Sequence, residues 1–130
     1  MGMRYALDRE KRIVRVRSWG LVTTRDVQDY FSRLMADPGF ESDFRCLHDM
    51  REAKQVAVET DHLVESAMAP IFHPGARRAI VAPLDVVYGI ARAYSVYNER
   101  AGQLVRVFRT MEEAEVWLET GGEEGESPVA

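Results

Sequence analysis

The sequence predicts an α/β domain: a five-stranded mixed sheet with about four helices, in the order ββαβαβαβα. Short runs rich in Val, Ile and Phe alternate along the chain with segments in which apolar residues recur every three or four positions. This alternation is typical of strands joined by helices, and it favours a mainly parallel sheet. The first two extended runs are separated only by a short polar turn, which indicates an antiparallel hairpin. A chain of 130 residues has the length of one domain.

The hairpin is expected at the start of the chain. Residues 4–8 form the first extended stretch, and the polar tetrad 8–11 forms the turn. In the second strand, Val14, Val16 and Ser18 fall on one face, while charged residues alternate with them on the other. A charge at every second position predicts a strand with one face near solvent.

The first helix is expected to begin after Thr23, which can cap it. Asp26 stands three residues on, as in a capping box. A stripe of apolar residues follows at helical spacing and is expected to face the core: Val27, Tyr30, Phe31, Leu34 and Met35. Pro38 and Gly39 then end the helix.

The second helix is expected between two strands. Residues 44–50 are interpreted as a buried strand and residues 52–58 as irregular chain. Thr60 is placed to cap the helix that follows. The short apolar run 79–82 is the best candidate for a strand buried on both faces.

The last two helices flank the final strand. Asp85 is placed to cap the third helix, and residues 104–108 form the last strand. Thr110 and Glu113 then make a second capping box at the start of a short final helix. The domain is therefore expected to cover residues 1–120.

The negative charge of the chain lies at its C-terminal end. Four of the 21 acidic residues lie in the last twelve positions, where there is no base, and the other 17 balance the 17 bases. Residues 121–130 are expected to be an acidic, disordered tail. The bases of the body are scattered, so nucleic acid is not an expected partner. With no signal peptide and no run of about 18–20 apolar residues, a cytoplasmic protein without a membrane span is expected.

Several segments carry a resemblance to a known family. They are IVRVRSWG in the hairpin, MADPGF after the first helix, LHDMRE, GARRAIVAPLDVVYGIARAY, and RVFRTMEEAEVWL. Over roughly residues 3–118 the chain resembles the SpoIIAA-like proteins, small bacterial domains that are related to STAS domains and also described as Sec14-like. The resemblance implies the fold, and its motifs are structural rather than catalytic. The small members of the family have no settled biochemical role.

The resemblance also bears on phosphorylation. In signalling STAS domains, a serine that follows an aspartate at the end of a strand is phosphorylated by a partner kinase. The matching aspartate here is Asp49, but Met50, Arg51 and Glu52 follow it. The usual phospho-serine switch is therefore not expected. Thr60, at the start of the next helix, is an alternative phosphorylation site, although a structural cap is the simpler interpretation.

Catalytic and metal sites find little support. A lone cysteine, Cys46, excludes an intrachain disulfide and a closed structural zinc site, and the three histidines lack metal-ligand spacing. Cys46 is interpreted as a small buried residue. A Cys–His dyad with His48 is an alternative, because both would lie on one face of a strand. An enzyme that uses His48 and Asp49 is another, and it requires both side chains in one concave pocket. No cofactor or metal is expected.

A binding site is expected where the strands end. The carboxyl ends of parallel strands meet at one edge of a sheet, and a helix N-terminus there favours anions. Asp49, Arg51, Asp85 and Arg109 come to this edge, and the two arginines are the residues expected to bind an anion. The alternative is that these arginines pair with nearby acids.

Tyrosines suggest a second kind of ligand. Tyr88 and Tyr97 fall off the expected inner stripe of the third helix, so they are expected to be exposed. Exposed tyrosines suit a partner or a lipid-like ligand, and the alternative is that the rings lie flat on the surface. Overall, the sequence favours a non-catalytic binding or regulatory domain. It would bind a protein or a small ligand at the carboxyl edge of the sheet. The alternative is a carrier of a lipid or other hydrophobic ligand. A homodimer is the oligomer to test, because two-fold symmetry is the commonest.

Overall fold

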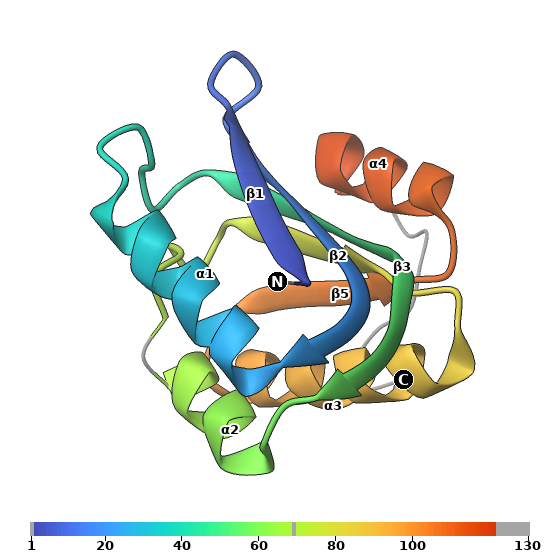
Figure 1. Cartoon of the computed structure of the whole chain (residues 1–130). Helices are drawn as coiled ribbons and strands as arrows, with labels where there is room; N and C mark the ends of the chain where they lie inside the picture. Colours follow the sequence, from blue (N-terminus) through green and yellow to red (C-terminus); the bar gives the residue numbers. More distant parts are fainter. Residues whose placement is uncertain (1, 69, 122–130) are drawn as a thin grey trace.

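The computed structural model describes residues 2–68 and 70–121 (Figure 1). The acidic tail from residue 122, with its expected disorder, lies outside the described residues. The elements follow the predicted order. They are β1 (Met3–Asp8), β2 (Ile13–Thr23), α1 (Thr24–Ala36), β3 (Arg45–Ala57), α2 (Thr60–Met68), β4 (Arg77–Val81), α3 (Asp85–Arg100), β5 (Leu104–Phe108) and α4 (Met111–Thr120).

The strands form one mixed sheet in the order β1-β2-β3-β4-β5. β1 runs antiparallel to β2, and every other neighbouring pair is parallel. The predicted hairpin and the predicted α/β architecture are therefore confirmed. Helices α1, α2 and α3 cover one face of the sheet, and α4 covers the other (Figure 1).

The side chains of β4 show why helices cover both faces of the sheet. Four of its five residues are buried, as the apolar run 79–82 predicted. Its side chains alternate between the faces. Ala79 and Val81 pack with Trp117 of α4, whereas Ile80 packs with Val87 of α3.

β2 and β3 are longer than the sequence indicated. Residues 52–58 were expected to be irregular, but β3 continues to Ala57 and pairs with β2 as far as Thr23. The register shifts between Arg17 and Trp19 and again after Gly20, whose φ is 59°. These irregularities let the two strands stay paired while they bend, as bulges commonly do. The prediction was wrong here because the pairing strand lies about 30 residues away in the sequence.

The start of α1 follows the local signal in the sequence. The Asp26 N–H donates to Thr23 Oγ1 at 3.2 Å, and the Thr23 N–H donates to Asp26 Oδ2 at 3.0 Å. The predicted capping box is thus confirmed. The apolar stripe is narrower than expected, because Tyr30 and Leu34 are buried while Met35 is 62% exposed. Met35 lies beside a groove between α1 and α2, so no core residue covers it.

Of the other three predicted caps, Thr60 is the first residue of α2, and the remaining two differ in outcome. Thr110 accepts a hydrogen bond from the Glu113 N–H at 3.2 Å and begins α4 as predicted. Asp85 does not cap α3, because Leu84 holds the capping position without a side-chain hydrogen bond. The carboxylate of Asp85 instead accepts a hydrogen bond from Arg109, 2.6 Å away. Asp85 is thus the first residue of the helix rather than its cap, and its side chain pairs with Arg109.

Candidate functional site

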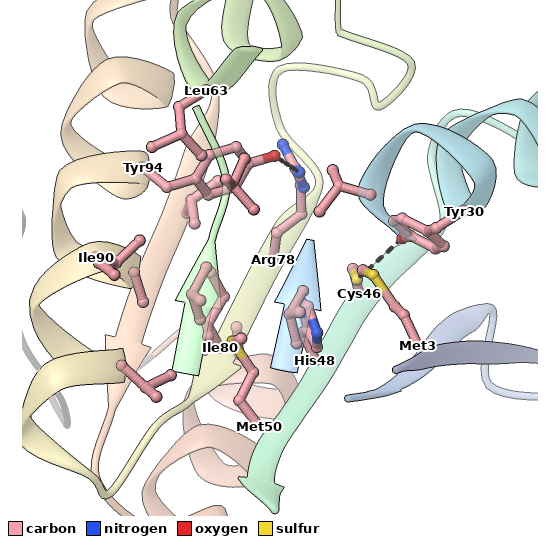
Figure 2. Close-up of a pocket in the computed structure, with 18 of the residues that line it drawn as sticks. Met3, Tyr30, Cys46, His48, Met50, Leu63, Arg78, Ile80, Ile90 and Tyr94 are labelled. Carbon is pink, nitrogen blue, oxygen red and sulfur yellow. Dashed lines mark hydrogen bonds between the residues drawn. The ribbon is translucent and has the colours of Figure 1, made fainter. Parts of the chain in front are cut away.

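A pocket lies on the sheet face that α1, α2 and α3 cover (Figure 2). It encloses about 80 Å³, several times the roughly 10–15 Å³ that one water molecule needs. Most of its wall is aliphatic, with residues from all five strands and three helices, including Val22, Met50, Leu63, Ile80, Ile90 and Val105. An apolar pocket with few polar groups is typical of a small-molecule site.

Three of the polar residues of the pocket come from alternate positions on two central strands. Cys46 and His48 of β3 and Arg78 of β4 line the pocket together with Ile80. Cys46 pairs with Arg78, and His48 pairs with Ile80, in the parallel register. Because strand side chains alternate between the faces, these residues share one face. The sheet therefore places an imidazole, a thiol and a guanidinium in one apolar wall.

Arg78 lies at one end of the pocket, and its side chain reaches toward Tyr94 (Figure 2). The residue is only 7% exposed. Its Nη1 donates to Asn98 Oδ1 at 3.0 Å, and its Nη2 donates to the Tyr94 hydroxyl at 2.7 Å. The guanidinium also lies 4.5 Å from the centre of the Phe72 ring. Its contacts within the described part of the chain are thus polar and aromatic but not ionic.

The sequence interpretation missed this arginine because Arg is mostly exposed in proteins. Arg78 stands immediately before the run 79–82 that was assigned to a buried strand, and this position was the available signal. Its partner Asn98, fully buried on α3, was also missed. An asparagine one turn from the helix end, inside an otherwise amphipathic pattern, is a weak signal by itself.

His48 is held neutral in the pocket wall. Its Nε2 lies 2.6 Å from Ser18 Oγ of β2. Burial lowers the pKa of His48 to about 4, the largest cause being desolvation of the charged ring. At neutral pH this imidazole carries no charge and forms a hydrogen bond with Ser18.

The two catalytic alternatives gain no geometric support. Burial raises the pKa of the Cys46 thiol, whose Sγ lies 3.9 Å from the Tyr30 hydroxyl. The imidazole of His48 pairs with Ser18 rather than with Cys46. Asp49 follows His48 on the strand, so its side chain points to the opposite face. The pocket required for a His48–Asp49 enzyme is therefore not formed.

The predicted strand-end residues come together as ion pairs. Arg51 donates through Nε and Nη2 to the two carboxylate oxygens of Asp49, at 3.0 and 2.9 Å. Burial acts to raise the pKa of Asp49, but the hydrogen bonds from Arg51 lower it below the ordinary value. Arg109 donates to Asp85 and, at 3.0 Å, to the Pro83 carbonyl. Both arginines are therefore paired with nearby acids in the unbound protein, which was the alternative interpretation. Ligand binding by these residues stays a prediction.

Tyr88 is not exposed, contrary to expectation. It is 9% exposed and packs in the core beneath Arg109, whose guanidinium lies 3.8 Å from the ring centre. Tyr97 is half-buried. The buried face of α3 includes Tyr88 and Ser95, so it is rotated from the stripe that the helical spacing predicted. Thr60 is the exposed first residue of α2, and its phosphorylation remains a prediction.

The described residues, 2–68 and 70–121, contain neither a membrane-spanning helix nor a metal-binding cluster. No helix there is both long enough and apolar enough to cross a bilayer. The same residues contain no group of three His, Cys, Asp or Glu side chains that could hold a metal ion.

Comparison with known proteins adds a structural relative. No family model and no curated protein matches the sequence. One solved structure that matches is an uncharacterised protein of the DUF3478 family from Shewanella loihica PV-4, described as having a SpoIIAA-like fold. The match covers 90% of this chain and 94% of that one, with a TM-score of 0.61 and 16% identity. The chain therefore has a SpoIIAA-like fold, and at this identity the likeness extends to the fold alone.

Proposed function

We propose that this protein is a non-catalytic binding domain that carries a small hydrophobic molecule in the pocket beneath α1, α2 and α3. The aliphatic cavity between the sheet and these helices is the observation that supports the proposal. Natural cores are close-packed, and few of their voids exceed the size of a water molecule. An apolar space that holds several waters leaves contacts unmade, and an apolar ligand can supply them.

A route into the pocket supports the same proposal. A groove between α1 and α2, with a volume of about 340 Å³, shares Arg78 and Phe31 with the pocket. The groove wall includes the exposed side chain of Met35 and the half-buried His62. In this proposal an apolar molecule enters between the two helices, where the groove and the pocket share lining residues.

The test compares two substitutions on one helix. Ala91 of α3 lines the pocket and is 6% exposed, whereas Ala93 of the same helix is exposed. Ala91→Leu should fill the cavity and weaken binding of the neutral fluorescent reporter N-phenyl-1-naphthylamine, and Ala93→Leu should leave it unchanged. Native mass spectrometry of the purified protein should show a bound apolar mass. Equal reporter binding by both variants, with no bound mass, would contradict the proposal.

A second candidate is a protein partner at the carboxyl edge of the sheet. There Leu84 and Val86 are 44% and 55% exposed beside the Asp85–Arg109 pair. Exposed apolar residues next to charged ones are typical of interaction surfaces. Substitution of Arg51 and Asp85 should then reduce capture of a partner, including a second copy of this chain, without lowering the melting temperature. Unchanged capture by this double variant would remove the edge as a binding site.

A further inference from the structure

The inference begins with an unbalanced charge inside the pocket. Arg78 is the cation of the lining, and the described lining residues include no Asp, Glu or Lys. Burial of a charge without an opposite charge is costly, because the ion loses its hydration. Two hydrogen bonds and an aromatic ring face the guanidinium, but they supply only partial negative charges.

The guanidinium also retains unused donors. An arginine has five N–H groups, and two of them donate to Asn98 and Tyr94. The Nε atom is buried and has no hydrogen-bond partner among the described residues. Unsatisfied buried donors are rare in folded proteins and call for a specific explanation. Because Arg78 lines the pocket, an anionic group bound beside it would balance the charge of the guanidinium.

We propose that Arg78 is the receptor for the headgroup of the carried molecule, and that this molecule is an amphiphile with one carboxylate and an apolar chain. This inference rests on the proposed pocket function and specifies its ligand. A carboxylate matches the planar guanidinium and can accept two parallel N–H bonds. The chain then lies against Ile80, Ile90 and Val105, while the headgroup lies where the pocket meets the α1–α2 groove.

The charge count favours a carboxylate over a phosphate monoester. A phosphate monoester carries nearly two negative charges at neutral pH. The pocket offers one cation, and His48, its other basic group, is neutral there because burial lowers its pKa to about 4. Glu65 on the outer groove adds a negative charge near the entrance. A single negative charge is therefore the best match.

Asn98 and Tyr94 are the positioning residues in this scheme. The Asn98 Nδ2 donates to the Tyr94 backbone carbonyl at 2.9 Å, which orients its Oδ1 toward Arg78. The two acceptors come from adjacent turns of α3 and hold one side of the guanidinium. The other three N–H groups of the guanidinium make no hydrogen bond to these two residues, and in this scheme they bind the ligand.

The test uses two probes that differ in the headgroup, octanoate and octan-1-ol. Wild-type protein should bind octanoate roughly 10- to 100-fold more tightly than octanol, the range expected for hydrogen bonds to a charged group. Arg78→Met should remove this preference and retain octanol binding. Arg15→Met, which removes an exposed arginine of β2 that pairs with Asp8, should change neither affinity.

A measurement on the wild-type protein keeps the test decisive if Arg78→Met does not fold. The side-chain Nε–H signal of Arg78 in a ¹⁵N-labelled sample should shift on titration with octanoate and stay in place with octanol. Equal binding of the two probes, without a shift, overturns the role of Arg78 but leaves the apolar pocket standing. Binding of neither probe overturns the pocket function as well. Tighter binding of octyl phosphate than of octanoate overturns the assignment to a carboxylate.

Discussion

The Nε2 atom of His48 lies 2.6 Å from the Oγ atom of Ser18. Ser18 is fully buried, so this hydrogen bond joins β2 to β3 inside the sheet. It is formed between neighbouring parallel strands near the point where the register of β2 and β3 shifts. A neutral imidazole is therefore part of the structural wall of the pocket.

Stability should depend on the protonation of His48. The folded ring takes up a proton only near pH 4, because burial lowers its pKa, whereas an unfolded histidine does so near pH 6.5. Between these values the unfolded state binds more protons. The contribution of neutral His48 to the free energy of unfolding is therefore complete above pH 6.5 and is lost as the pH falls through 4. The loss amounts to roughly 2–3 kcal/mol.

Urea unfolding at pH 7.5, 6 and 4.5 measures this dependence. His48→Gln should remove much of the loss, and the matched variant His73→Gln, at an exposed position, should retain it. An NMR titration that gives His48 a pKa near 6.5 would contradict the expectation.

Arg109 should matter more to stability than its ion-pair partner. Asp85 is almost fully exposed, and exposed ion pairs contribute little. Arg109 also covers the ring of Tyr88 at 3.8 Å, and this contact keeps the ring out of water. Arg109→Ala should lower the melting temperature clearly, and Asp85→Ala should lower it only slightly. The reverse order would show that the ion pair, rather than the ring contact, stabilises this edge.

Two glycines should respond oppositely to the same substitution. Gly20 has a φ of 59° where β2 changes register, so Gly20→Ala should destabilise the protein by about 1 kcal/mol. Gly89 lies within α3, and no neighbouring atom would meet an added Cβ. Gly89→Ala should therefore stabilise it by about 0.5–1 kcal/mol. Denaturant unfolding of the two variants measures both changes in the free energy of unfolding. If Gly20→Ala is as stable as the wild-type protein, the bend in β2 can adopt another backbone conformation.

The thiol of Cys46 should be inert in the folded protein. Burial raises its pKa and keeps reagents away, so iodoacetamide at pH 8 should modify the native protein far more slowly than the protein in urea. Mass spectrometry over time follows the reaction, with Cys46→Ser as the blank. Rapid native modification would indicate an accessible thiolate and would reopen the dyad hypothesis.

Local signals explain the part of the fold that the sequence predicts well. Thr23 with Asp26, and Thr110 with Glu113, act over three residues, so the sequence identifies both helix starts. The hairpin turn and the alternation of strand and helix periods likewise depend on residues that are close together in the chain. These features were enough to predict the element order and the mixed sheet.

Contacts between distant residues explain the errors. The second half of β3 is a strand because it pairs with the end of β2, which no periodicity within 52–58 reveals. The side chain of Asp85 does not cap α3 but pairs with Arg109, which is 24 residues away. The same arginine covers the ring of Tyr88. In each case a neighbour supplied by the fold outweighed the local pattern.

The sequence by itself determined the class of fold, because capping and hydrophobic period are encoded within a few consecutive residues. Only the tertiary structure decided the candidate site. Arg78 meets Asn98 across 20 residues, and Ser18 meets His48 across 30. The sequence alone would place an arginine in water, and only the packing of β4 against α3 places this one in an apolar wall. The physical reason is that burial and hydrogen-bond partners are properties of the assembled sheet and helices.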